Sequence, residues 1–458
     1  MISIVLCAAA FIFTYFAGRR SLVAGLVCVI GVGYFYGIMR ANLQETYSHF
    51  IFDAAVVGLY ITQFSKKLPR GDSGRLAPLR LWVGILMGWP FLLFFIPVQD
   101  YAVQAVGLRG NVFLLPFILL GARLGEQEVR QLAVAFAVLN LAVFVFAVAE
   151  YFLGVSRFYP QNQVTVSIYK SLVDEDISKP LRSDLLRIPA TFTGAHAYAG
   201  TMVLTFVYLF GAWARRGRWV SWEKGLINAA MVATVLGIFM AAVRSPVIIL
   251  ALVLAVIFLT GHLKLHTLAL FFAMVVGVGW FVSSEERLQR FTSLKDTDLV
   301  TERVTWSVNE NFLELMTEYP MGNGLGGGGT SIPYFLQGRI VPPLFYMESE
   351  YARIVLEQGV FGLCLWLAFL VWAFARGTGS RDEPWFLGRR MLWVACAAFF
   401  ATGMIGTGLL TSIPGTPLLL LSLGWIAVRQ RGRAGASVPA AEHRGEGEWR
   451  GLPAEQYG

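Results

Sequence analysis

Long runs of apolar residues, separated by short polar segments, follow one another along most of the chain. A helix needs about 20 predominantly apolar residues to cross the hydrocarbon core of a bilayer. The runs near residues 110 and 413 are short enough for re-entrant or tilted segments. The pattern predicts an all-α polytopic integral membrane protein with about 12–13 transmembrane helices. The predicted spans lie near residues 1–17, 21–39, 49–64, 80–97, 110–122, 131–154, 193–213, 225–243, 245–260, 265–283, 351–375, 391–410 and 413–428.

Composition supports this interpretation of the apolar runs. The 458 residues are 56% hydrophobic and 14% charged, with a mean hydropathy of +0.61, whereas a soluble domain carries about 25% charged residues. We therefore expect one transmembrane domain over residues 1–428 and no separate soluble domain. The last 30 or so residues, 429–458, are rich in Gly, Ala, Pro and charge and predict a disordered cytoplasmic tail.

The basic residues indicate which side each loop occupies. Every second loop is positive, and such loops face the cytoplasm. The alternation favours 13 spans, with the N-terminus outside the cytosol and the tail inside. The net charge is +8, but the sequence contains no soluble segment rich in both basic and aromatic residues, so nucleic-acid binding is not expected. The basic loops contain Arg19 and Arg20; Lys66, Lys67, Arg70, Arg75 and Arg80; Arg123 and Arg130; Arg215, Arg216, Arg218 and Lys224; Lys264; Arg376, Arg381, Arg389 and Arg390; and Arg429, Arg431 and Arg433.

Two long loops fall on the predicted outer side, at residues 155–192 and 284–350. Loops of this length usually carry function. Within the second loop, an apolar stripe predicts an amphipathic helix that ends at Pro320. The stripe consists of Val304, Val308, Phe312, Leu315 and Tyr319. The glycine-rich "MGNGLGGGG" that follows is either a hinge or a place where backbone N–H groups approach a phosphate or sugar.

Two basic side chains at span ends are candidates for substrate contact. Arg244 interrupts two apolar runs with almost no loop between them, and it either snorkels to the interface or clamps an anion at the outer mouth. His196 opens a span after the first outer loop and is either structural or a ligand of a sugar hydroxyl or phosphate. The four cysteines lie in apolar runs without CxxC spacing, so neither a disulfide framework nor a metal site is predicted.

The order of several motifs resembles the O-antigen ligase/polymerase superfamily of bacterial envelope proteins. The similar stretches are "TFTGAHAYAG", "AAVRSPV", "RVTWSVNENFLELMTEYPMGNGLGGG" and "ESEYARIVLEQGVFGL", within about residues 187–363. The resemblance implies glycan transfer from a polyprenyl-diphosphate carrier on the outer face of the inner membrane, without a metal or other cofactor. It also implies that Arg244 and Arg303 neutralise the diphosphate.

The last motif departs from that of the ligases in one informative way. Glu348 stands where ligases carry a His, and this favours a polymerase with Glu348 as general base. Glu350, Arg353 and His196 are predicted to orient the reactants or to bind sugar, whereas Glu357 is expected to pack or hydrogen-bond within its own helix. The Ser-Arg motif of the family is also altered, because Val243 precedes Arg244.

We therefore expect a multi-pass bacterial inner-membrane enzyme whose active site faces the periplasm. It would polymerise lipid-linked oligosaccharides into a surface polysaccharide, with a chain-length regulator and a flippase as possible partners. An O-antigen or protein glycan ligase is the first alternative. A flippase for the same lipid-linked sugars is the second, although its charges would lie at midplane depth rather than at the outer side.

Overall fold

The computed structural model describes most of the chain and shows that it is helical. The described residues are 1–43, 45–66, 70–160, 162, 165, 187–215, 221–260, 301, 305, 312–330, 332–342, 347, 349–376 and 383–428. Within them the chain forms α-helices and short 3-10 helices, and no strand occurs. The predicted all-α class is therefore confirmed.

The apolar runs fold into helices long enough to cross a membrane. Eight described segments meet that requirement, and two shorter apolar helices accompany them, which confirms a multi-pass membrane protein. The first half of the chain contains α1 (Ile2–Arg20), α2 (Leu22–Asn42), α3 (Ile51–Phe64), α4 (Arg70–Leu93), α5 (Tyr101–Val112), α6 (Pro116–Ala122) and α7 (Glu126–Leu153). The second half contains α9 (Ala195–Ala214), α10 (Ser221–Met240), α11 (Arg244–Leu259), α15 (Glu314–Glu318), α16 (Glu350–Phe374), α17 (Phe386–Thr402) and α18 (Gly415–Ala427).

The predicted short span near 110–122 is part of a longer helical segment. The chain is helical from Tyr101, and α5 and α6 together form one apolar segment of 22 residues with a break near Phe113. The predicted spans elsewhere correspond to helices, apart from the run at 265–283, which lies outside the described residues. The tail at 429–458 also lies outside them, and its disorder stays a prediction.

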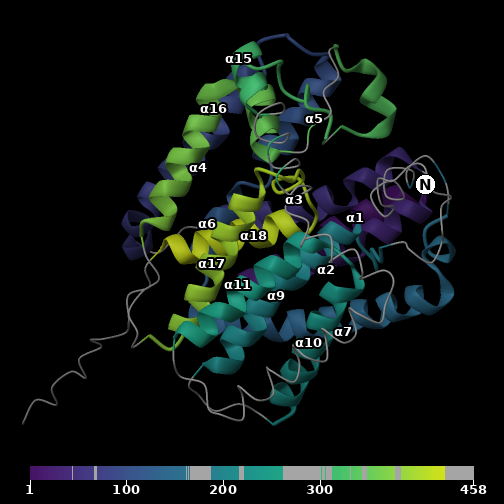
Figure 1. Cartoon of the computed structure of the whole chain (residues 1–458), viewed down its shortest axis with the longest axis vertical. Helices are drawn as coiled ribbons and strands as arrows, with labels where there is room; N and C mark the ends of the chain where they lie inside the picture. Colours follow the sequence, from purple (N-terminus) through teal and green to yellow (C-terminus); the bar gives the residue numbers. More distant parts are fainter. Residues whose placement is uncertain are drawn as a thin grey trace, which may run out of the picture.

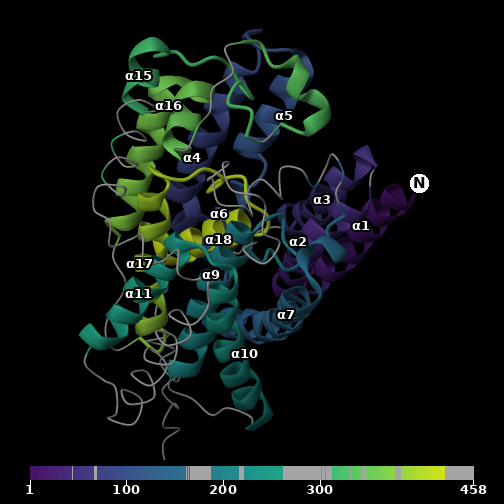
Figure 2. The same cartoon turned by 45° about the vertical axis from the view of Figure 1, so that its right-hand side comes forward.

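Close backbone contacts hold the central helices together. A Cβ on Gly121 of α6 would lie 1.9 Å from the Leu421 carbonyl oxygen of α18, and a Cβ on Gly424 would lie 1.9 Å from the Ile118 carbonyl oxygen. Such mutual approach of small residues is the usual way in which membrane helices pack. Figures 1 and 2 show α6 and α18 side by side in the middle of the molecule.

A separate group of segments lies at one end of the molecule. Figures 1 and 2 show α5, α15 and part of α16 together at the top of the view, away from α10 at the bottom. Of the predicted amphipathic helix, the structure describes α15, which ends two residues before Pro320, as expected. Val304 and Val308 lie outside the described residues.

Candidate functional site

Helix α16 begins with a capped turn and is broken at Gly359. The Ser349 hydroxyl accepts a hydrogen bond from the Ala352 N–H at 3.3 Å, which caps the helix. Gly359 has φ 72° and ψ 176°, values that a residue with a side chain adopts only under strain. At this break, the Val360 N–H donates to the Pro320 carbonyl at 2.9 Å. The break therefore fixes the middle of the outer loop, at Pro320, against α16.

The first two turns of α16 carry a buried ion-pair triad. The Arg353 guanidinium lies between Glu350 and Glu357, with Nη2 2.6 Å from Glu350 Oε1 and Nη1 2.9 Å from Glu357 Oε2. All three side chains are at most 1% exposed. Spacings of three and four residues place such side chains on one helix face. Glu357 thus hydrogen-bonds within its helix, as the sequence predicted.

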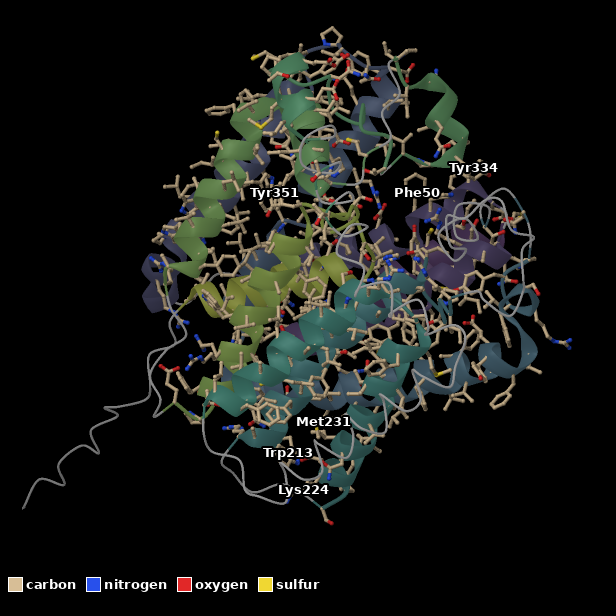
Figure 3. The ribbon with its side chains drawn as sticks, viewed as in Figure 1. Phe50, Trp213, Lys224, Met231, Tyr334 and Tyr351 are labelled. Atoms are coloured by element: carbon tan, nitrogen blue, oxygen red, sulfur yellow. The ribbon has the colours of Figure 1, made fainter. Side chains whose placement is uncertain are left out.

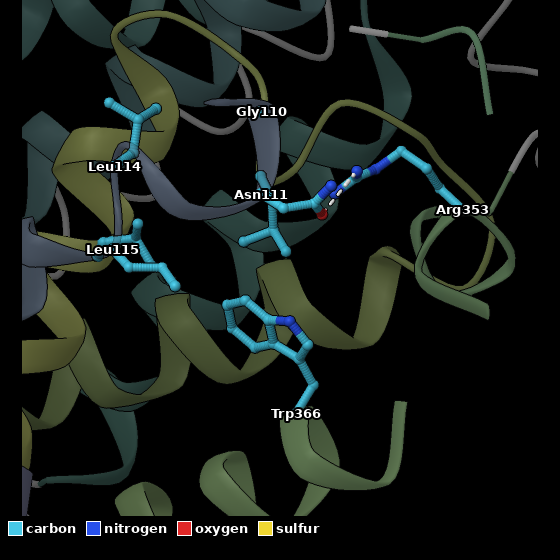
Figure 4. Close-up of a pocket in the computed structure, with 8 residues that line it drawn as sticks. Gly110, Asn111, Leu114, Leu115, Arg353 and Trp366 are labelled. Atoms are coloured by element: carbon cyan, nitrogen blue, oxygen red, sulfur yellow. Dashed lines mark hydrogen bonds between the residues drawn. The ribbon is translucent and has the colours of Figure 1, made fainter. Parts of the chain in front are cut away.

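Asn111 of α5 joins the triad from another part of the chain. Its Nδ2 donates to Glu357 Oε2 at 2.6 Å, and its Oδ1 accepts from Arg353 Nη1 at 3.2 Å and from Gln358 Nε2 at 2.8 Å. Figure 4 shows Arg353 reaching toward Asn111 beside a small cavity of about 10 Å³, which has room for about one water molecule. The cavity lies among Gly110, Asn111, Leu114, Leu115, Arg353, Trp366, Leu410 and Leu420.

Glu350 also holds the turn between α17 and α18. Its Oε2 accepts hydrogen bonds from the Gly408 N–H at 2.8 Å and the Leu409 N–H at 3.1 Å, while its own N–H donates to the Gly403 carbonyl at 2.8 Å. The structure thus brings together two of the predicted site residues, Glu350 and Arg353, and gives both of them protein partners. Their predicted contact with sugar stays a prediction.

Arg244 occupies the first position of α11 and is half-buried. It follows a tight turn in which Ala242 has a φ of 52°. Its Nε is buried without a hydrogen-bond partner, and no described residue forms an ion pair or hydrogen bond with its guanidinium. A partly buried guanidinium without an internal partner is suited to an anionic ligand.

His196 is the second residue of α9 and is exposed. Short connections join α9 to α10 and α10 to α11, so α9 and α11 begin at the same end of this three-helix group. His196 and Arg244 therefore share the end that the charge pattern predicts to be outer, although they lie on different helices. Glu348 and Arg303, the other predicted site residues, lie outside the described residues.

Sequence reasoning missed Asn111 and Glu150. Asn111 falls in "YAVQAVGLRGNV", where polar residues interrupt an apolar run, and polar residues inside spans usually have a partner or a function. Glu150, at the end of α7, is 1% exposed and accepts a hydrogen bond from the Ala190 N–H at 2.8 Å. It thereby holds the segment that leads into His196. An acid within an apolar run was the available signal for Glu150.

Comparison with known protein families supports the resemblance found in the motifs. Residues 229–367 match the family model Wzy_C, which is described as O-antigen ligase. The matched segment includes Arg244 and the triad but not His196 or Asn111. No curated protein matches the chain. The match supports the O-antigen ligase/polymerase superfamily and, with it, a membrane enzyme of that type.

Proposed function

We propose that the protein is a polysaccharide polymerase on the periplasmic face of the bacterial inner membrane. It transfers oligosaccharide units from a polyprenyl-diphosphate carrier and needs no metal. The observation that carries the proposal is the environment of Arg244. This residue is the first of a helix inside the segment that matches the family model, and its half-buried guanidinium forms no hydrogen bond or ion pair with a described residue. A guanidinium grips a diphosphate through paired hydrogen bonds.

The reaction needs a base and an anion site. A hydroxyl oxygen of the acceptor sugar attacks the anomeric carbon of the donor, the bond from that carbon to the diphosphate oxygen breaks, and the hydroxyl proton passes to the Glu348 carboxylate. Arg244 and Arg303 stabilise the departing diphosphate, whose charge grows in the transition state. His196 contacts sugar or phosphate near the start of α9.

Glu350 and Arg353 act in this proposal mainly by fixing the backbone that carries Glu348. Ser349, the next residue after Glu348, is buried and caps α16, and Glu350 attaches the start of this helix to the α17–α18 turn. Fixing the segment that follows a catalytic base helps to keep the reacting groups oriented. The triad thus supports the predicted orienting role of Glu350 and Arg353.

A ligase that moves finished glycan to another acceptor is the second candidate. The family model is described as O-antigen ligase, which favours it. The Glu at position 348, where ligases carry a His, favours the polymerase. The product distinguishes them, since a polymerase lengthens glycan on the carrier, whereas a ligase removes glycan from the carrier.

The test follows lipid-linked glycan in cells that depend on the introduced gene. Glu348→Gln and Arg244→Gln should both leave the protein level unchanged and cause single repeat units to accumulate on the carrier. Glu318→Gln and Arg339→Gln are matched controls, because both residues are exposed in the same outer loop, and each should give normal polymer. Accumulation of full-length polymer on the carrier in Glu348→Gln cells would identify a ligase instead. Normal polymer in both test variants would overturn the proposed site.

A further inference from the structure

A second group of charged residues lies outside the site described above, near the ends of α2 and α5. The His49 cluster consists of Arg40, His49, Asp53 and Arg109, which come from α2, the 3-10 helix η1 (Thr46–Phe50), α3 and α5. None of these residues lies in the segment that matches the family model. The cluster is therefore a feature of the N-terminal part of the chain.

His49 is buried with an unused nitrogen. The residue is only 7% exposed, and its Nε2 has no hydrogen-bond partner among the residues that the structure describes. Its backbone carbonyl accepts a hydrogen bond from the Tyr36 hydroxyl at 2.9 Å, which fixes the residue against α2. A buried polar atom without a partner costs about 1–3 kcal/mol. A ligand or an ordered water molecule would supply the missing partner.

The charges around His49 leave an excess of positive charge. Arg109 binds Asp53 through two contacts, Nε to Oδ2 at 2.6 Å and Nη2 to Oδ1 at 2.5 Å. Arg40 instead lies over the ring of Tyr36, 5.4 Å from its centroid, and no described carboxylate pairs with it. The Arg40 Nε is buried, and no described residue forms a hydrogen bond with it. Among the described residues, one of the two guanidinium groups thus lacks a counter-ion.

Aromatic rings of the outer loop border the same place. The His49 ring lies edge-on to Phe335, with centroids 5.6 Å apart, and 6.1 Å from the ring of Tyr334. Both belong to η6 (Tyr334–Arg339), and Phe335 is 39% exposed. Figure 3 shows Tyr334 and Phe50 on the same side of the molecule, away from Lys224 and Trp213. The cluster therefore lies next to exposed ring surface at the end opposite the α9–α10 connection.

We infer that the His49 cluster binds an anionic oxygen group, a carboxylate or a phosphate, of the glycan substrate, with Arg40 and His49 as its donors. The inference rests on the proposed function for the identity of the substrate. A guanidinium N–H and an imidazole N–H both donate to such oxygens. The adjacent rings provide an apolar face for the sugar that carries the anion. The substrate class is thus an acidic glycan or the carrier's own diphosphate.

Binding of free anions tests the inference without requiring transfer. The purified protein, in nanodiscs of uncharged-headgroup phosphatidylcholine, is titrated with glucuronate, with inorganic pyrophosphate and with glucose as the uncharged control. Thermal stabilisation measures each affinity. Arg40→Gln and His49→Gln should each weaken binding of one anion by about tenfold, which corresponds to about 1.4 kcal/mol. Arg157→Gln, at an exposed residue on the same predicted face, should leave it unchanged.

The variants separate the sources of the anion and the two proposals. Loss of glucuronate binding alone assigns the cluster to an acidic sugar, and loss of pyrophosphate binding alone assigns it to the carrier diphosphate. The Arg244→Gln variant should still bind the anion whose binding depends on Arg40. The result for the His49 cluster therefore stands even if the proposed diphosphate site at Arg244 is wrong. If Arg40→Gln and His49→Gln, each still folded, bind both anions as the wild type does, or if the wild type binds neither, the inference is overturned.

Discussion

His49 occupies a position that disfavours its protonated form. Burial lowers its pKa to about 3, and the positive charges of Arg40 and Arg109 add to the effect. His49 lies in η1, which ends at Phe50, before helix α3 begins at Ile51. The unfolded chain protonates a histidine near pH 6.5. Between about pH 6.5 and 3 the unfolded state therefore binds the proton that the folded state excludes, and folding free energy is lost as the pH falls.

The first prediction concerns this loss. Wild-type protein in detergent should become less stable as the pH falls from 7.5 to 5.0, with a contribution from His49 of at most about 1.4 kcal/mol per pH unit. His49→Gln removes the titrating group and should flatten the curve over the same range. Thermal unfolding followed by tryptophan fluorescence measures both. Parallel curves for the two proteins would show that His49 is not the group responsible.

At the scale of elements, the glycine-rich segment is held against two helices. The Asn323 N–H donates to the Leu356 carbonyl of α16 at 2.6 Å. A Cβ on Gly107 of α5 would lie 2.3 Å from the Gly326 nitrogen. Three glycines of the segment near these contacts, Gly322, Gly324 and Gly326, have φ values of 80–81°. The glycines let three backbones meet here. The two sequence-based interpretations, a hinge or an approach of N–H groups to a phosphate or sugar, stay predictions.

Replacement of Gly359 tests the break in α16. Gly359→Ala places alanine in a backbone conformation that only glycine adopts without strain. The added Cβ would lie 2.9 Å from the Pro320 carbonyl oxygen. We expect a destabilisation of about 1–3 kcal/mol and weaker attachment of the outer loop. Gly84→Ala in α4 is the matched control, since nothing lies within 4 Å of its Cβ. Equal melting temperatures for the two variants would contradict the role assigned to this break.

At the scale of the whole molecule, hydropathy predicted most of the spans because each span is a local property of the chain. The run at 131–154, for example, corresponds to Glu126–Leu153. The segment before residue 110 was missed because Gln104 and Arg109 lower its hydropathy. Both are satisfied inside the protein, Gln104 by the Ile96 carbonyl at 2.9 Å and Arg109 by Asp53. Such hydrogen-bond and ion-pair partners offset the free-energy cost of placing polar side chains inside a membrane span.

The buried cluster around Arg353 was not predictable in the same way. Glu350, Arg353 and Glu357 share a helix face, and their spacing is visible in the sequence. Their link to Asn111 joins residues 246 positions apart, and the Glu350 link to Gly408 spans 58 positions. No local pattern reports such contacts. The predicted substrate roles of Glu350 and Arg353 stay predictions, and the structure adds a polar network that connects α5, α16 and the α17–α18 turn.

Arg353→Gln tests whether this network holds the molecule together. The change leaves two buried carboxylates without their counter-ion, and removal of one partner from a buried ion pair costs about 3–5 kcal/mol. Arg339→Gln breaks the exposed pair with Asp100 and should cost about 1 kcal/mol or less. Thermal unfolding compares them. Adding Glu357→Gln to Arg353→Gln should recover part of the loss, because one unpaired carboxylate is then removed. If Arg353→Gln abolished polymer while melting like Arg339→Gln, Arg353 would instead act on substrate.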